Sequence, residues 1–170
     1  KALASLERDG LVAGRVVGRT RLVRIDPRAF ARRELERYHH KDIVDKVLTT
    51  GGVANMFLQA DGRDPGALTT DFMRKEVQEY DSYVGECKAL LAKYRDRILL
   101  PSDLILNDGG KRKPIHAKDL PASLQVYDIG LDTIARYSEE VRDAKTVFFN
   151  GPAGVFELDE FSIGTREILR

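Results

Sequence analysis

From residue 44 onward, short apolar runs alternate with longer stretches whose apolar positions recur every three or four residues. Short apolar runs are typical of buried strands, and the periodic stretches are typical of amphipathic helices. Strands are therefore predicted at residues 44–50, 98–100, 104–106, 125–128 and 146–149. The alternation predicts an α/β fold with a mainly parallel, Rossmann-like sheet in three layers, because parallel strands need helices on both faces.

The periodic stretches predict helices at residues 53–60, from Asp71 to Tyr94, from Gly130 and from Phe156 onward. The long helix would begin at Asp71 as its cap and bury one apolar stripe. The stripe consists of Phe72, Val77, Tyr80, Val84, Cys87, Leu91 and Tyr94. Tyr80 and Cys87 are expected to be core residues.

Two polar features between these elements have structural interpretations. Residues 107–110 form a strong turn signal, with a returning strand predicted at 113–117 and the basic residues 111–113 in an exposed turn. Asp128 and Thr133 are expected to be structural, as a carboxylate at a strand end and a hydroxyl at a helix start.

The first 40 residues have a different pattern and are predicted to be a small α+β appendage to a main domain at 41–170. Arginine and threonine alternate with apolar residues from Arg15 to Ile25, with a turn around Gly18–Arg19, as in a half-exposed hairpin. A helical segment ending at Gly10 precedes the hairpin, and another begins after Asp26–Pro27.

Charge supports this division. Residues 1–38 hold ten lysines and arginines against five aspartates and glutamates, whereas the rest hold eighteen against twenty-two. Hydrophobic residues at 42% and charged residues at 32% are ordinary for a globular protein, and the longest apolar runs are far too short to span a bilayer. Cys87 is the only cysteine, which excludes an internal disulfide or a cysteine zinc site and favours the cytoplasm.

The segment LERDGLV, the arginine-rich hairpin and RIDP resemble the back half of a winged helix-turn-helix domain. That resemblance makes DNA a candidate partner, through phosphate contacts of Arg15, Arg19, Arg21 and Arg24. A solvated basic hairpin without a DNA role is the favoured interpretation of this isolated piece. His39–His40 lacks a third ligand nearby, so an exposed junction is favoured over a metal site.

Two glycine-rich loops each follow a predicted strand and lead toward a helix. They are Thr49–Ala54 and Asn150–Val155. Glycine permits close approach to a flat ring or a phosphate, and a helix N-terminus attracts anions. Glu157 follows one turn beyond Gly154, where a carboxylate could accept hydrogen bonds from ribose hydroxyls. Neither loop has the spacing of a Rossmann fingerprint or a P-loop.

The amino-acid sequences of several segments, and their order along the chain, are more specific evidence than either glycine-rich loop alone. The chain contains, in this order, the segments TTGGVANMFL, LLPSDLIL, YDIGLDTI, and AKTVFFNGPAGVFE followed by FSIGT. Together they resemble the C-terminal domain of phosphoglycerate kinase, and their residues are closest to the archaeal type. The resemblance covers residues 42–170 and implies binding of ATP or ADP with Mg²⁺. It places adenine against the first loop and the wall of the second, Asn150 near the phosphates and Glu157 on the ribose. The implied nucleotide-binding residues are Gly51, Gly52, Asn150, Pro152, Gly154, Val155 and Glu157.

The resemblance also implies that parts of the family's machinery lie outside this sequence. A GGAK-type loop would precede Lys41, a GGGD[ST]-type loop with the magnesium-holding aspartate would follow Arg170, and the 3-phosphoglycerate-binding N-terminal domain is absent. No catalytic residue and no metal ligand is therefore assigned here, and 3-phosphoglycerate is expected to bind only with the missing domain supplied. Alternative hypotheses are a DNA-binding or regulatory fusion that uses the kinase half as a ligand-binding module, and a non-functional fusion fragment.

Overall fold

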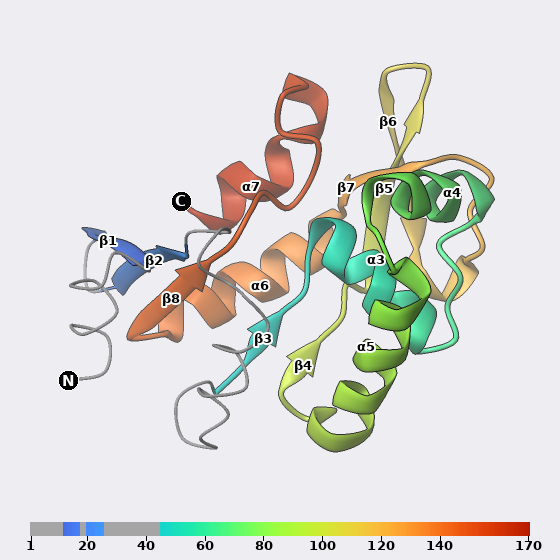
Figure 1. Ribbon diagram of the computed structural model, residues 1–170. Coiled ribbons are helices and arrows are strands. Elements are labelled where there is room, and N and C mark those ends of the chain that lie inside the picture. The colour runs from blue at the N-terminus through green and yellow to red at the C-terminus, as the bar shows by residue number, and fades with distance from the viewer. Residues whose placement is uncertain (1–11, 18–19, 26–44) are drawn as a thin grey trace. The chain divides into compact units, whose positions relative to one another are not determined.

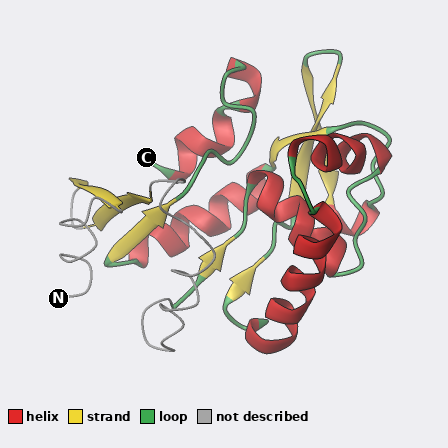
Figure 2. Ribbon diagram, in the orientation of Figure 1, coloured by secondary structure: helices red, strands yellow, loops and turns green. Residues whose placement is uncertain are grey.

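Helices and strands alternate along the chain, as the apolar pattern predicts, and the α/β fold class is confirmed (Figures 1 and 2). The computed structural model describes residues 12–17, 20–25 and 45–170. The chain divides into two units, Lys1–Asp45 with Glu139–Gly151, and Lys46–Ser138 with Pro152–Arg170.

The second unit contains most of the described elements. Its strands are β3 (Val47–Leu48), β4 (Ile98–Leu99), β5 (Asp103–Asp108), β6 (Lys111–His116) and β7 (Val126–Ile129). Its helices are α3 (Gly51–Ala60), α4 (Ala67–Glu76), α5 (Tyr80–Tyr94), α7 (Ile163–Ile168) and the 3₁₀ turns η1 (Ala117–Asp119) and η2 (Asp159–Phe161). Helix α6 (Leu131–Asp143) begins in this unit and ends in the other.

The described strands form three hydrogen-bonded groups instead of the one mainly parallel sheet that we predicted. Strands β3 and β4 pair in parallel. Strand β5 lies between β6 and β7 and is antiparallel to both. The difference arises at residues 107–110, where the predicted turn folds the chain back into a β5–β6 hairpin.

In the first unit, β1 (Val12–Val17) and β2 (Thr20–Ile25) form the predicted antiparallel hairpin. Arginines within the hairpin favour contact with water, so we expect the hairpin not to cover an edge of the sheet. This expectation is wrong, because β2 also pairs in parallel with β8 (Thr146–Phe149). Side chains in a strand project from the faces of the sheet, and an alternating row of arginines therefore leaves the main-chain edge free to pair. The predicted helices before and after the hairpin, Arg19 and His39–His40 lie outside the described residues.

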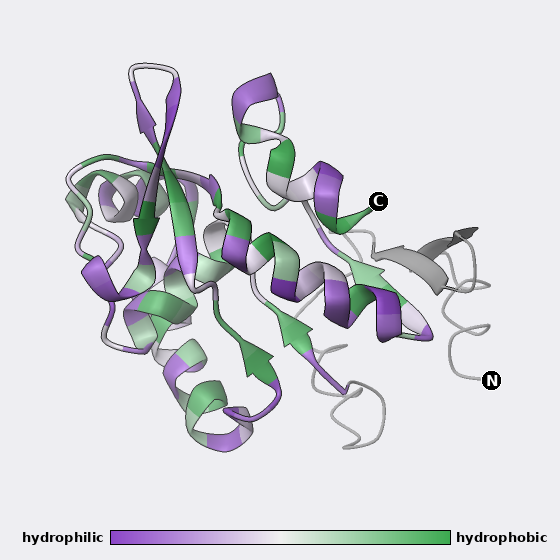
Figure 3. Cartoon of the chain, turned by 180° about the vertical axis from the view of Figure 1, so that it is seen from behind, coloured by the Kyte–Doolittle hydropathy of each residue, from purple (hydrophilic) through white to green (hydrophobic). Residues whose placement is uncertain are grey.

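The core of the second unit lies where α3 and α5 pack against β4, β5 and η1. Its buried residues are Phe57, Leu58, Cys87, Leu91, Ile98, Leu100, Leu104 and Ala117. Strands β3 and β4 are hydrophobic, whereas the outer part of the β5–β6 hairpin is hydrophilic (Figure 3). Tyr80 and Cys87 are buried, which confirms their prediction as core residues.

The prediction of one continuous helix from Asp71 to Tyr94 is wrong, because the segment forms two helices, α4 and α5. Val77 leaves the helical conformation, and Glu79 has a left-handed φ of 59°. Asp71 lies inside α4, and Phe72 is exposed instead of belonging to the buried stripe. Apolar spacing continues across the break, so the pattern gives no sign of it.

The last helix also begins later than predicted, at Ile163 instead of Phe156. Residues before it form a loop whose main chain bonds to β7, because the Val155 N–H donates to the Tyr127 carbonyl at 2.8 Å. Phe156 is exposed.

The buried thiol of Cys87 provides a first prediction. Burial raises its pKa to about 11, and the nearby Glu86 carboxylate adds to the rise. Since the thiolate is the reactive species, we expect maleimide to modify the native chain at pH 8 roughly a hundredfold more slowly than the urea-unfolded chain. Mass spectrometry over time measures both rates, with Cys87→Ser as the unlabelled control. Equal rates would show that the α3–α5 core opens freely.

Candidate functional site

The two glycine-rich loops are in direct contact, as the sequence predicts. Helix α3 begins at Gly51, whose N–H donates to the Ala153 carbonyl of the second loop at 3.1 Å. Gly51 has a φ of 57°, and a Cβ there would lie 3.1 Å from the Pro152 carbonyl oxygen. The contact therefore depends on glycine at this position for both its dihedral angle and its small size.

Gly154 is required by packing within the protein, whereas Gly52 lies against the flexible end of a side chain. A Cβ on Gly52 would lie 2.9 Å from Cε of Met73. A Cβ on Gly154 would lie 2.6 Å from three oxygens, namely Asp128 Oδ1 and the carbonyls of Tyr127 and Phe161. The sequence interpretation attributed these glycines to close approach of a ligand, and the structure gives Gly154 a second, internal reason.

The second loop and the residues just beyond it combine exposed side chains with a main chain that is hydrogen-bonded to the rest of the unit. Ala153 is buried, and its N–H donates to Thr165 Oγ1 at 2.8 Å. Gly154 and Val155 are half-buried, whereas Pro152 and Glu157 are exposed. The side chain of Glu157 is thus available to a ligand on a segment whose main chain is held from below.

Six of the seven predicted site residues belong to the second unit, four of them in the second loop or just beyond it. The seventh, Asn150, follows β8 in the first unit and is exposed there. A nucleotide contact by any of the seven remains a prediction.

Asp128 is the most densely bonded carboxylate beneath this loop. Its side chain is fully buried, accepts hydrogen bonds from the N–H groups of Ile129 and Gly164 at 2.9 and 3.0 Å, and pairs with Arg112 at 3.0 Å. Burial raises the pKa of Asp128, while the Gly164 N–H and the Arg112 guanidinium act to lower it. Asp128 is therefore structural, as expected, and depends on its partners to hold a buried charge.

Sequence reasoning missed the role of Arg112. We expected residues 111–113 in an exposed turn, but Arg112 lies on β6, and its side chain is only 16% exposed. Strand alternation could have separated it from its neighbours, because residues 111 and 113 face the opposite side of the strand.

Thr133 and Asp103 close the N-terminus of α6. Thr133 Oγ1 donates to Asp103 Oδ1 at 2.6 Å, and the Asp103 carboxylate accepts the N–H groups of Asp132 and Thr133 at 3.1 and 2.8 Å. The expected structural role of Thr133 matches this arrangement. Because a carboxylate of the chain already occupies this helix end, it offers no free anion site.

The described part of the chain contains neither a cluster of metal ligands nor a membrane-spanning helix. No group of three or more His, Cys, Asp or Glu side chains there could hold a metal ion. Among the same residues, no helix is both long and apolar enough to cross a membrane.

Comparison with known proteins gives a consistent result. The family model for phosphoglycerate kinase matches residues 38–170. The chain is 45% identical over 133 residues to the phosphoglycerate kinase of Thermoplasma volcanium, covering 78% of this chain and 32% of the relative. It is 45% identical over 127 residues to phosphoglycerate kinase 2 of Methanosarcina acetivorans, covering 74% and 30%.

Comparison with solved structures agrees with the sequence comparisons. The crystal structure of phosphoglycerate kinase from Pyrococcus horikoshii superposes with a TM-score of 0.66 at 35% identity, covering 74% of this chain and 31% of that one. The phosphoglycerate kinase of Coxiella burnetii gives a TM-score of 0.53 at 29% identity. The chain spans about a third of the length of the curated relatives it matches.

Proposed function

Because the chain belongs to the phosphoglycerate kinase family, we propose that it supplies part of the ATP- and ADP-binding half of an enzyme that transfers a phosphoryl group between ATP and 3-phosphoglycerate in glycolysis and gluconeogenesis. Residues 41–170 form an incomplete nucleotide-binding domain in this proposal, and residues 1–40 a separate appendage that resembles part of a winged helix. The proposed location is the cytoplasm.

The observation that carries the proposal is the Gly51–Ala153 hydrogen bond. It brings together two loops distant in sequence, each of which the family resemblance connects with the nucleotide. The N-terminus of α3 lies at this contact and has no acidic residue in its first turn, so its partial positive charge is not offset locally.

The proposed nucleotide lies with its adenine against Gly51, Gly52 and the wall made by residues 152–155. Glu157, exposed just beyond the second loop, accepts hydrogen bonds from the ribose hydroxyls. A role of Asn150 at the phosphate end rests on the family resemblance alone, since Asn150 belongs to the other unit. Mg²⁺ would arrive with the phosphates, since it is usually held by few carboxylates and by phosphate oxygens. The described residues offer no preformed metal cluster, so we assign no magnesium ligand to this chain.

DNA binding is not favoured as a second function. Strand β2, which carries Arg21 and Arg24, is hydrogen-bonded on one edge to β1 and on the other to β8. That pairing gives the hairpin a role in the sheet, which needs no nucleic-acid partner.

The proposed site predicts weak, sub-millimolar ADP binding. The residues proposed for adenine and ribose lie on this chain, while the family resemblance places the phosphate and magnesium loops outside it, so we expect a dissociation constant of roughly 0.1–1 mM, about −4 to −5.5 kcal/mol. Glu157→Ala should weaken it several-fold through loss of charge-assisted hydrogen bonds to the ribose. Isothermal titration calorimetry of wild type and variant with ADP measures both.

Glu139→Ala, an exposed glutamate on α6, is the matched control and should bind as wild type does. Equal affinities of all three proteins would remove Glu157 from the site. Absence of any ADP binding by the folded wild-type chain would overturn the proposed function.

A further inference from the structure

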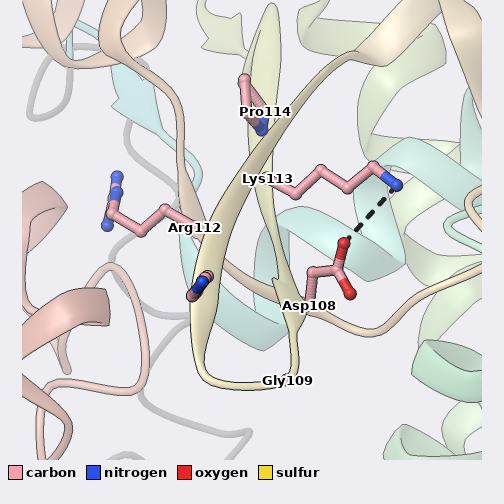
Figure 4. Close-up of a pocket in the computed structure, with 6 residues that line it drawn as sticks. Asp108, Gly109, Arg112, Lys113 and Pro114 are labelled. Atoms are coloured by element: carbon pink, nitrogen blue, oxygen red, sulfur yellow. Dashed lines mark ion pairs between the residues drawn. The ribbon is translucent and has the colours of Figure 1, made fainter.

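The Arg112 side chain joins the β5–β6 hairpin to β7 and to η2. Its Nη1 donates to Asp128 Oδ2 at 3.0 Å and to the Glu160 carbonyl at 2.5 Å. Lys113, the next residue, points to the opposite side of the hairpin, where its Nζ lies 3.7 Å from Asp108 and its side chain is 56% exposed (Figure 4). Two neighbouring cations on one strand thus have different environments, one facing solvent and one facing the loop.

Asp128, the partner of Arg112, lies between two glycines of the segment 152–164. A Cβ on Gly154 would lie 2.6 Å from Asp128 Oδ1, and a Cβ on Gly164 would lie 2.2 Å from the same atom. The Gly164 N–H also donates to Asp128 Oδ2 at 3.0 Å. One carboxylate therefore packs closely against Gly154 and accepts a hydrogen bond from Gly164.

Glu157 lies between these two glycines in the sequence. The Val155 N–H donates to the Tyr127 carbonyl at 2.8 Å, and the Leu158 N–H closes a turn onto the Val155 carbonyl at 3.0 Å. On the other side of Glu157, the Glu160 carbonyl accepts the bond from Arg112. The exposed carboxylate is thus carried by a short turn that is anchored on both sides, and Arg112 supplies the second anchor.

We propose that Arg112 and Asp128 are positioning residues that hold the 152–164 loop, and through it Glu157, in place for the adenine nucleotide. The inference rests on the nucleotide site proposed above. Neither side chain needs to touch the ligand. Removing Arg112 frees the Glu160 carbonyl and leaves a buried carboxylate with main-chain donors alone, which is the costly way to break a buried ion pair.

The test compares Arg112→Met with Lys113→Met, which removes the same charge from the opposite side of the same strand. ADP affinity is measured by calorimetry, and hydrogen exchange is measured at the Val155 and Gly164 amides without ligand. We expect Arg112→Met to weaken ADP binding about tenfold and to speed exchange at both amides, while Lys113→Met stays within twofold of wild type.

A third variant, Arg112→Met with Asp128→Asn, removes both charges and guards against simple failure of the single variant to fold. It should be more stable than Arg112→Met, because no orphaned carboxylate remains.

A series of stability measurements at different pH values separates the effect of charge from that of packing. Without Arg112 the pKa of Asp128 rises further, so lowering the pH neutralises the carboxyl sooner and the stability deficit of Arg112→Met shrinks. Of the groups that contact Asp128, Arg112 of β6 is charged, and the others are the main-chain N–H groups of Ile129 and of Gly164 in α7. The double variant should show no such recovery.

The outcomes separate this inference from the proposed function. If wild type binds no ADP, the function fails, and the amide exchange alone decides whether Arg112 holds the loop. If Arg112→Met binds ADP and exchanges as wild type does, or if Lys113→Met is equally impaired, the positioning role is refuted. A double variant that is less stable than Arg112→Met would also refute it.

Discussion

The 170-residue chain on its own is expected to form no measurable ATP from 1,3-bisphosphoglycerate and ADP. Phosphoryl transfer depends on holding the two reactants in line with their charges neutralised. The chain covers about a third of the length of its curated relatives, so the partner half that would hold the acceptor is not supplied. The loss of effective molarity alone costs on the order of 7 kcal/mol, which is roughly a 10⁵-fold lower rate.

A coupled assay with purified protein tests this prediction, and the intact enzyme of Thermoplasma volcanium at equal concentration is the positive control. Any activity must survive extensive purification and disappear on heat denaturation to count. Turnover within a hundredfold of the intact enzyme would contradict the expectation and would mean that this third of the family's length suffices for catalysis.

Gly154→Ala is expected to destabilise the chain by about 3 kcal/mol, at the upper end of overpacking costs. The new Cβ would lie 2.6 Å from two main-chain carbonyl oxygens and from Asp128 Oδ1, and main-chain atoms cannot rotate away as a flexible side chain can. For a chain of this size the loss corresponds to a fall of roughly 6–12 °C in Tm, which calorimetry or circular dichroism measures.

Gly85→Ala is the matched control for this substitution. Gly85 lies within α5, and an added Cβ would meet nothing within 4 Å. Alanine is favoured over glycine in a helix by roughly 1 kcal/mol, so the control should melt at the same temperature or higher. If both substitutions had the same effect, the close packing around Gly154 would be refuted.

The sequence predicted the positions of several strands well. The apolar runs at 98–100, 104–106 and 146–149 correspond to strands, and β8 has the predicted bounds. It did not predict the helix break before Tyr80, because Val77 and Tyr80 continue the apolar spacing on both sides of Glu79. Dihedral angles at a single polar residue leave no trace in a hydrophobic pattern.

Strand pairing was less predictable, since it depends on contacts between residues far apart in the chain. The turn at 107–110 and the strand that returns after it were predicted, but the antiparallel pairing of β7 with the other edge of β5 was not. The two glycine loops were connected in advance only by the family resemblance, which places adenine against both, because their preceding strands β3 and β8 lie in different hydrogen-bonded groups. The burial of Arg112 was missed because a run of three basic residues is usually solvated. Strand alternation could have separated Arg112 from its neighbours, but it does not identify the buried partner, Asp128, which lies 16 residues further on.

The β5–β6 hairpin therefore has a tip that should tolerate insertions and paired strands that should not tolerate deletions. At the tip, Gly109 and Gly110 have positive φ angles and open space around them, so a peptide tag or a small domain inserted there would leave the register of β5 and β6 intact. In the stem, deletion of one residue would exchange the faces of residues 112 and 113, placing a lysine against Asp128 and an arginine in solvent. An engineer labelling this protein should extend the hairpin at its tip and never shorten its strands.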